Sequence, residues 1–486
     1  MSTAPQSSPA APASPTAELA AFAAALRYED IPPEVVAHTR LCLLDTFGCG
    51  LYGATLRWTG ILRDTVAPHD PGTPSTVWGT PDRLSAPHAA LVNGTAVHAF
   101  ELDDLHKLAI VHPGSVVTSA ALATAEDSAA RGADVSGKRL LTAVVAGYEV
   151  AARTGMSVGA AHLRQGWHPT GTHGTLGAAA AAGSLLGLDA AGMRDALGTA
   201  GSQSAGLMAA QYGSMVKRFH AGRAAQSGVY AALLAERGFA GIAELFEAEY
   251  GGYCGTFSPE HDLAPLTAGL GEVWETATIG FKPYSTNGSC HPTIDMLLEL
   301  HATEGLSAAD VAAVRVRCST ATKVHVGWDY EPDSVTTAQM NLPYIVAAVL
   351  TDGDAFVDQF TEERVRDPAL TALSRLVTVA ADPDIDALGD AYRHATRLEI
   401  TLRDGRSFTR SRDHARGSAA APLTAADVRE KYHKLAAKAL PAERAERLAA
   451  AVDSLGGHPD DLRALTDALR APAAPARDPR GHHPCD

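Results

Sequence analysis

The chain has 486 residues, of which 46% are hydrophobic and 20% charged, a composition typical of a soluble globular protein with more than one domain. Its formal net charge of −15 argues against non-specific binding to nucleic acid or to an anionic membrane surface, but not against a small anionic ligand, which responds to local charge. No apolar run approaches the roughly 18 residues of a membrane-spanning helix, and the six cysteines form no CxxC pair, so a reducing cytoplasmic location is expected.

Helical spacing of apolar residues dominates the first half of the chain. Residues 1–15, MSTAPQSSPAAPASP, lack the basic start and apolar core of a signal peptide and predict a disordered tail. Between residues 16 and 270, alanine- and glycine-rich runs such as SAPHAALVNGTAVHAFEL predict helices that approach one another closely. In that run Ser85 is expected to cap the helix and Pro87 to occupy its first turn. These patterns predict an all-helical core.

The pattern changes near Glu272. β-Branched residues and alternation predict strands within VWETATIGFKPY, AAVRVRCST, RLVTVAADP and TRLEITLRDGRSFTRSR, and Asp404-Gly405 marks a hairpin turn in the last of these. Helices are expected between them, at CHPTIDMLLELHATEG and TAQMNLPYIVAAVLTDG. Residues 271–414 therefore predict a smaller α/β domain.

The segment that follows returns to a helical pattern. Residues 415–470 are expected to pack back on the large domain, and residues 471–486 predict a second disordered tail. The predicted fold class is mostly α, with an all-helical large domain formed by residues 16–270 and 415–470 and a smaller α/β domain.

Ionisable residues are concentrated in the stretch ELDDLHKLAIVHPGSVV. Glu101, Asp103 and Asp104 lie at the expected end of a helix, where the helix dipole disfavours each anion by about 0.3–1 kcal/mol. One interpretation is a solvated turn. The other is that the acids orient basic neighbours such as His106 or His112 by hydrogen bonds.

Three histidines precede a proline at an expected helix start, namely His112, His168 and His291. Because proline is favoured in the first helical turn, each histidine should lie at or just before a helix N-terminus. The positive end of the dipole keeps a nearby imidazole neutral, as a base must be, and attracts a carboxylate. His458 and His483 show the same dipeptide in segments that have the composition of surface, so one His-Pro pair is weak evidence.

Other candidate residues are basic or aromatic. Lys217, Arg218 and His220 precede or begin a helix, which indicates either an anion clamp or a solvated basic turn. Tyr344 leads an apolar helix, where a core tyrosine is the usual explanation. The spacing in HPTGTHG differs from HExxH, so no metal site is predicted, and no phosphate loop, GxSxG elbow or dinucleotide fingerprint indicates a cofactor.

Four motifs, taken in chain order, resemble the MmgE/PrpD family, which includes 2-methylcitrate dehydratases, cis-aconitate decarboxylases and iminodisuccinate epimerases. The motifs are ELDDLHKLAIVHPGS, GWHPTGTHGTLGAAAAAGSLLGL, AQYGSMVKRFHAGRAAQSG and CHPTID, and the match covers roughly Ala17 to Leu469. The resemblance implies a helical large domain, a smaller α/β domain, a cleft between them and a homodimer. It also implies catalysis without metal or organic cofactor.

The resemblance further assigns roles to residues of this chain. The catalytic candidates are His112, His168, Lys217, His291 and Tyr344. The candidates for binding or orienting the substrate are Glu101, Asp103, Asp104, Arg218 and His220. Leu105 stands where animal decarboxylases resemble one another in having threonine, and HPGS stands in place of the HPS form of many dehydratases.

The implied function is a cofactor-independent lyase that dehydrates or decarboxylates a small di- or tricarboxylate by acid–base catalysis. The first alternative is an epimerase of an imino- or aminodicarboxylate within the same fold. The second is a non-catalytic carboxylate-binding scaffold. Small anionic acids are the expected ligands of all three, and the sequence alone does not choose between dehydration, decarboxylation and epimerisation.

Overall fold

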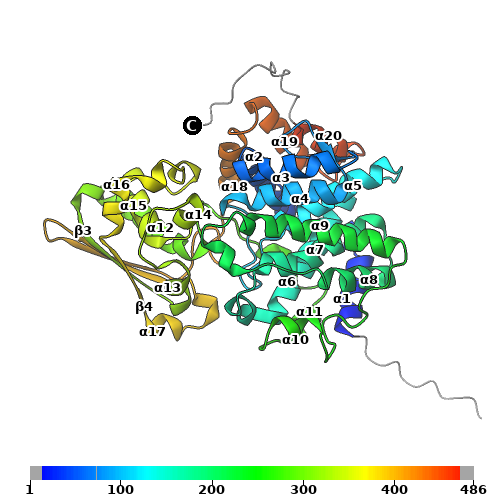
Figure 1. Cartoon of the computed structure of the whole chain (residues 1–486), viewed down its shortest axis with the longest axis horizontal. Coiled ribbons are helices and arrows are strands. Elements are labelled where there is room, and N and C mark those ends of the chain that lie inside the picture. Colours follow the sequence, from blue (N-terminus) through cyan, green and yellow to red (C-terminus); the bar gives the residue numbers. More distant parts are fainter. Residues whose placement is uncertain (1–13, 73, 471–486) are drawn as a thin grey trace, which may run out of the picture.

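The computed structural model describes residues 14–72 and 74–470, which form a large helical part and a smaller part built around a sheet (Figure 1). The predicted tails lie outside the described residues, except for residues 14 and 15. There α1 begins at Pro15, and the Ser14 hydroxyl accepts a hydrogen bond from the N–H of Ala17 at 3.3 Å. Within the described part, no helix is long and apolar enough to cross a membrane.

The large part is built from helices of the N-terminal half, with α7 and α9 at its centre, where α7 packs on α6 and α9, and α9 packs on α4. The close approach depends on residues without a side chain: a Cβ atom at Gly222 of α9 would lie 2.1 Å from the Leu91 carbonyl oxygen of α4. The helices are α1 (Pro15–Ala25), α2 (Pro33–Ala54), α3 (Arg57–Val66), α4 (Ala86–Val97), α5 (Ser119–Ala130), α6 (Gly137–Arg164), α7 (Pro169–Leu186), α8 (Ala190–Gly201), α9 (Val216–Glu236), α10 (Tyr253–Phe257) and α11 (Ala264–Thr267).

The start of α4 corrects one prediction. Ser85 directly precedes the helix, but its hydroxyl donates to Asp70 Oδ2 at 2.6 Å and makes no capping bond. The short antiparallel strands β1 (Ser75–Thr76) and β2 (Arg83–Leu84) lie just before this helix. A second irregularity follows it, where a π-helical segment, Gly114–Thr118, leads into α5. Single π-helical turns inside helices are frequent at functional sites.

The smaller part contains a four-stranded sheet in the order β4-β3-β5-β6, in which β3 and β4 are parallel and the other pairs antiparallel. Helices α12 and α15 pack against it. The strands are β3 (Val311–Cys318), β4 (Val377–Ala381), β5 (Thr396–Leu402) and β6 (Ser407–Arg412). The helices are α12 (His291–Glu304), α13 (Thr320–Val326), α14 (Val335–Gln339), α15 (Leu342–Asp352), α16 (Pro368–Ser374) and α17 (Pro383–Asp386).

Three of the four predicted strand regions are confirmed, but the strand predicted in VWETATIGFKPY is wrong. It forms a 3₁₀ turn, Glu275–Thr278, and then runs on without a regular element. Its polar groups bond to the large part instead of to a sheet: Thr276 N–H donates to Glu149 at 2.9 Å, and Gly280 N–H donates to the Leu105 carbonyl at 2.9 Å. Alternating β-branched residues therefore mark a connecting segment here.

The C-terminal helices α18 (Ala425–Ala436), α19 (Ala442–Ser454) and α20 (Asp461–Leu469) lie on the large part, where α18 packs against α2 (Figure 1). From α18, the buried Lys431 ammonium pairs with Asp45 at 2.6 Å and donates to the Leu102 carbonyl at 2.5 Å. Helix α18 thus supports the loop that carries the predicted acids. The division at residues 271 and 415 stays a prediction.

Candidate active site

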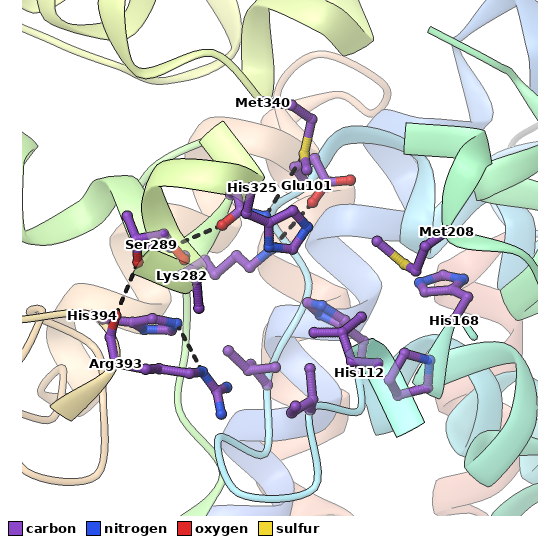
Figure 2. Close-up of a pocket in the computed structure, with 18 of the residues that line it drawn as sticks. Glu101, His112, His168, Met208, Lys282, Ser289, His325, Met340, Arg393 and His394 are labelled. Atoms are coloured by element: carbon purple, nitrogen blue, oxygen red, sulfur yellow. Dashed lines mark hydrogen bonds and ion pairs between the residues drawn. The ribbon is translucent and has the colours of Figure 1, made fainter. Parts of the chain in front are cut away.

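A cavity of about 110 Å³ lies between side chains of the large part and side chains of the smaller part (Figure 2). Four of the predicted site residues line it, namely Glu101, His112, His168 and Lys217. The polar residues that line it from the smaller part are Lys282, Asn287, Ser289, Thr322, His325, Arg393 and His394.

Glu101 is the anionic centre of the site. It follows the 3₁₀ turn His98–Phe100 with a left-handed φ of 57°, an uncommon conformation for a residue with a side chain, which turns the chain sharply at this point. Its buried carboxylate accepts hydrogen bonds from Lys217 and Arg218 and lies 3.5 Å from the Lys282 ammonium. Three cations thus share one carboxylate, which leaves the cluster with about two positive charges in excess.

These contacts set the pKa values of the cluster. Burial alone would raise the pKa of Glu101, but Lys217, Lys282 and Arg218 together hold it well below its usual range, so the carboxylate stays charged. Burial lowers the pKa of Lys217 to about 8, partly countered by Glu101. Lys217 is therefore a lysine that is largely protonated near neutral pH yet able to give up its proton.

His112 lies just before the π-helical segment, as its His-Pro motif predicts. Its Nδ1–H donates to the Asp104 carbonyl at 2.7 Å, so the neutral ring presents an unprotonated Nε2. Burial lowers the pKa of His112 to about 3, although Asp103 opposes this shift. The ring is therefore neutral at physiological pH and has the form that a base requires.

His168 is the N-cap residue of α7, which confirms the predicted helix start. Its Nδ1 lies 3.0 Å from Nδ1 of His220, so one of the two neutral rings donates to the other. Burial, together with His98 and Lys217, keeps the pKa of His168 well below its usual range, and burial lowers that of His220 to about 4. His220 thus fixes the orientation of His168.

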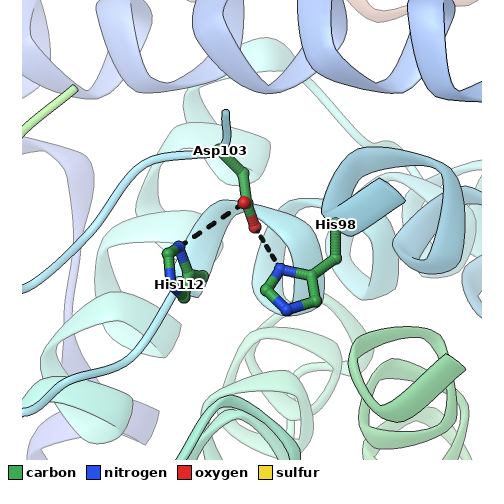
Figure 3. A group of neighbouring side chains, drawn as sticks. All are labelled: His98, Asp103 and His112. Carbon is green, nitrogen blue, oxygen red and sulfur yellow. Dashed lines mark hydrogen bonds and ion pairs between the residues drawn. The ribbon is translucent and has the colours of Figure 1, made fainter. Parts of the chain in front are cut away.

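Asp103 bridges two histidines, one of which sequence reasoning missed (Figure 3). His98 Nδ1 donates to Asp103 Oδ2 at 2.7 Å, and His112 Nδ1 lies 3.5 Å from Oδ1. The His98 ring also lies 5.0 Å from the His112 ring and 5.4 Å from that of His168, measured between centroids. Burial would raise the pKa of Asp103, but His98 and His112 hold it below its usual range.

Among the described residues, this His98, Asp103 and His112 group is the one whose composition and spacing would also suit a metal ion, with potential donor atoms within 4.8 Å of one another. Two of its three pairs, however, are already connected through Asp103, and both Nδ1 atoms carry the proton that they donate. The Lys282 charge also acts on Asp103. The group is therefore held together by these contacts, but His98 Nε2 and Asp103 Oδ1 have no hydrogen-bond partner in the described part of the chain.

Asp104 supports the site from behind and does not line the cavity. Its carboxyl accepts from the N–H of Gly114 and from the hydroxyl of Tyr148, both at 2.9 Å. Burial, with Asp45 and Asp103 nearby, raises its pKa well above the usual range. Asp104 thus ties the loop of the acids to the start of the π-helical segment.

Two predicted catalytic residues lie away from this cavity. Tyr344 is fully buried in the core of the smaller part, where its hydroxyl donates to the Gln359 carbonyl at 2.7 Å and its ring packs on Tyr330. Tyr344 therefore does not line the cavity at which His112, His168 and Lys217 meet. His291 is the first residue of α12 and lines a smaller adjoining cavity.

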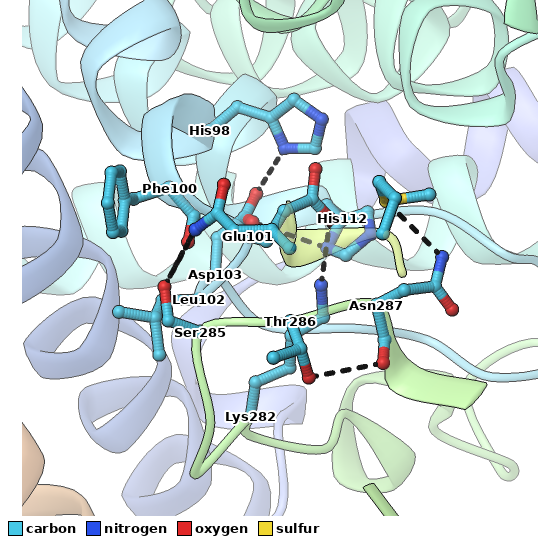
Figure 4. A network of polar contacts seen from close by, with 12 residues as sticks. His98, Phe100, Glu101, Leu102, Asp103, His112, Lys282, Ser285, Thr286 and Asn287 are labelled. Atoms are coloured by element: carbon cyan, nitrogen blue, oxygen red, sulfur yellow. Dashed lines mark hydrogen bonds and ion pairs between the residues drawn. The ribbon is translucent and has the colours of Figure 1, made fainter. Parts of the chain in front are cut away.

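The loop of residues 98–104 is held to the smaller part by side-chain hydrogen bonds to one main-chain carbonyl (Figure 4). The Phe100 carbonyl accepts from the Ser285 hydroxyl at 2.8 Å and from the Gln339 amide at 3.0 Å. These bonds place Lys282, three residues before Ser285, against Glu101. Sequence reasoning missed Lys282, His325, Arg393 and His394 because none of them belongs to a His-Pro motif or to a predicted helix start.

Comparison with known proteins decides the family. Residues 17–264 match the MmgE/PrpD N-terminal domain, and residues 284–456 match the MmgE/PrpD C-terminal domain. The chain belongs to the MmgE/PrpD family. It is similar to the cis-aconitate decarboxylase-like protein oryM of Aspergillus oryzae, with 34% identity over 90% of this chain and 94% of the relative.

Two further relatives are cis-aconitate decarboxylases. That of Aspergillus terreus is 32% identical over 96% of this chain and 97% of its own length, and that of Homo sapiens is 30% identical over 93% of both. The chain is therefore an enzyme of the MmgE/PrpD type, and it groups with lyases of that family.

Proposed function

We propose that the chain decarboxylates cis-aconitate or a closely related tricarboxylate, with histidine and lysine side chains as the acid–base groups and without a cofactor. The observation that carries the proposal is the excess of buried positive charge around Glu101, in a cavity that also contains two neutral imidazoles. The names of the similar proteins favour decarboxylation over the other reactions.

The charge excess favours a ligand with several carboxylates. Charges taken out of water are costly unless they are paired, and removing one partner of a buried pair typically costs about 3–5 kcal/mol. A polycarboxylate in the cavity would supply the missing anions to Lys217 and Lys282, which both line it. Charge-assisted hydrogen bonds of this kind are among the strong ones.

The chemical step needs a proton at carbon. When the bond between carbon and a carboxylate breaks, carbon dioxide leaves and the electron pair moves into the conjugated system of double bond and neighbouring carboxylate. Fixed cations stabilise that developing charge. Protonation at carbon completes the reaction, so one proton is consumed for each carbon dioxide released.

Lys217 is the proposed acid and carboxylate ligand, because it lines the cavity and its pKa of about 8 keeps it protonated near pH 7. His112 and His168, both neutral, relay protons at the reacting carbons, and Lys217 recovers from solvent the one proton that each turnover consumes. In this scheme Glu101 orients Lys217 and Arg218, Asp103 orients His112, and His220 orients His168, whereas Tyr344 stabilises the fold.

The test is NMR of the purified chain with ¹³C-labelled cis-aconitate in deuterated water. We expect carbon dioxide and one deuterium per product molecule, and we expect Lys217→Met to abolish both. Lys323→Met is the matched control, because the Lys323 ammonium in α13 donates to the Gly327 carbonyl at 2.8 Å and does not line the cavity.

The same NMR experiment, repeated with other acids, separates the alternatives. Loss of water from a 2-methylcitrate-like acid without decarboxylation of cis-aconitate would replace the proposal by a dehydratase. Deuterium uptake by an iminodicarboxylate without net conversion would identify an epimerase. Binding of these acids with no reaction of any would support a non-catalytic scaffold.

A further inference from the structure

Gln339 is the last residue of α14, and its side chain is fully buried. Its amide nitrogen donates to the Phe100 carbonyl at 3.0 Å and to the Ser285 hydroxyl at 2.9 Å. Its amide oxygen accepts from Arg218 Nη2 at 3.2 Å. One side chain of the smaller part thus connects helix α9, the loop of residues 98–104 and the segment before α12.

The orientation of this amide is set by its partners. The Ser285 hydroxyl donates its only proton to the Phe100 carbonyl at 2.8 Å, so it can only accept from Gln339. A guanidinium donates and never accepts, so the atom that faces Arg218 must be the amide oxygen. A flipped amide would place its oxygen against two acceptors and its nitrogen against a donor. Both ends of the amide therefore have a defined partner.

The partners of Gln339 keep other hydrogen bonds without it. Arg218 also donates to Glu101 and, at 3.3 Å, to the Thr336 hydroxyl. The other two partners bond to each other. Loss of the amide would therefore leave each partner group with a hydrogen bond, which limits the cost to stability. In the described part of the chain, what the amide adds is a hydrogen-bonded link from the Arg218 side chain to the main chain of the loop.

This link bears on Lys217, the residue before Arg218 in α9. Both side chains contact the Glu101 carboxylate, so a displaced Arg218 or a displaced loop would change how Glu101 lies against Lys217. Lys217 is buried, and burial is the largest cause of its lowered pKa. Looser packing would admit water and raise that pKa. The other titratable or charged groups that interact with Lys217 are Glu101, Arg218, Lys282, His168, His220 and His325.

We infer that Gln339 is a positioning residue of this site: its amide holds Arg218 in register with the loop and so keeps Lys217 aligned with Glu101 and shielded from water. The inference rests on the proposed function, in which Lys217 is the acid. Gln339 does not line the cavity, so its effect on the reaction passes through Lys217. A misplacement of about 1 Å at a reacting group can lower turnover by about 10²-fold.

The test measures the pKa of Lys217 without turnover. Acetylation of Lys217 by acetic anhydride is followed by mass spectrometry as a function of pH, since only the unprotonated amine reacts. In Gln339→Met we expect the pKa to rise by about one unit from about 8, because water reaches the ammonium. Since Lys217 acts in its protonated form, the basic limb of kcat should move to higher pH. At its plateau kcat should fall by about 10- to 100-fold.

Thr336→Val is the matched control for the contacts of Arg218. It removes a contact of nearly the same length, 3.3 Å against 3.2 Å, but leaves the Gln339 amide and its link to the loop in place. We expect neither the Lys217 pKa nor kcat to change. Equal changes in Thr336→Val and Gln339→Met would overturn the inference, because loss of any Arg218 contact would then suffice.

Asn341→Leu is the control for stability. The fully buried Asn341 amide donates to the Trp328 carbonyl at 2.7 Å and accepts from the Tyr344 N–H at 2.9 Å, both within the smaller part. The variant should lower the melting temperature, as Gln339→Met does, and leave the Lys217 pKa unchanged. A raised Lys217 pKa in this variant would overturn the inference, since any loss of stability would then produce it.

Gln339→Asn guards against misfolding of the first variant. It keeps an amide but is one methylene group shorter, so it cannot reach both Arg218 and the loop, and it should raise the Lys217 pKa in the same direction. An unchanged Lys217 pKa in both Gln339 variants would overturn the inference. A parent that releases no carbon dioxide from cis-aconitate would refute the proposed reaction, whereas a raised Lys217 pKa in Gln339→Met would still support the positioning role.

Discussion

Replacing Glu101 by glutamine should move the pH dependence of catalysis. The carboxylate helps to keep Lys217 protonated, because its charge raises a pKa that burial has lowered to about 8. Loss of an opposite charge in close contact lowers such a pKa by about 1–3 units. Since Lys217 must be protonated to act as an acid, activity is lost as the pH rises through its pKa, and the variant should lose it at lower pH.

The size of the effect follows from these values. With a decrease of about two units, the protonated fraction of Lys217 at about pH 7.5 falls from roughly 0.8 to roughly 0.03, a loss of about 25-fold in the active form. The assay is kcat/KM and kcat as functions of pH with the true substrate. At pH values below the lowered pKa, where Lys217 is still protonated, KM should not rise, because the variant then has one more uncompensated cation to attract the acid.

Glu149→Gln is the matched control for stability. Glu149 is also a fully buried carboxylate beside an arginine, with Arg153 at 3.2 Å, but it does not line the cavity. Either substitution should lower stability by up to about 3–5 kcal/mol, as loss of a buried partner does. Only Glu101→Gln should move the basic limb. An unchanged limb, or one displaced to higher pH, would refute the role given to Lys217.

Four further outcomes are expected. His168→Ala should lower kcat by a factor of about 10²–10⁴ and affect KM less. The measurement is steady-state kinetics, after circular dichroism confirms folding. A near-normal kcat would remove His168 from the mechanism. Tyr344→Phe should keep kcat within about threefold and cost about 1 kcal/mol in denaturant unfolding, since its hydroxyl bonds only within the core; a large fall in kcat at intact stability would contradict this. Dialysis against EDTA should leave the activity intact, and recovery of lost activity by zinc or iron alone would show that the enzyme needs a metal. Light scattering at micromolar concentration should give a dimer, for which the exposed Tyr230 and Leu234 on α9 offer apolar surface; a stable monomer would exclude it.

Sequence reasoning found the residues whose signal is local. His112, His168 and Lys217 occur at or next to helix starts, which proline and basic residues indicate in the sequence. The structure brings all three to one cavity with Glu101. His98 was not predicted as a site residue because its sequence position fits the helical pattern of the preceding residues. The 3₁₀ turn and the left-handed Glu101 reverse the chain there, so that Asp103 folds back on His98.

The wall contributed by the smaller part could not be found in this way. Lys282 and Glu101 are 181 residues apart in sequence, and their contact depends on bonds from Ser285 and Gln339 to one main-chain carbonyl. The same connection explains why the strand predicted in VWETATIGFKPY does not form: the polar groups of this segment bond to the large part. Periodicity describes the faces of elements, and it contains no information about which distant loops meet.

The charge of the site also differs from that of the chain, and this difference bears on the mechanism. A chain with a net charge of −15 repels polycarboxylates at long range, so selection of such an acid must come from short-range contacts inside the cavity. The cations there come from both parts of the molecule, Lys217 from α9 and Lys282 from the segment before α12. In the proposed reaction, an acid bound between them neutralises the excess and connects the two parts, and the same contacts stabilise the charge that develops as carbon dioxide leaves.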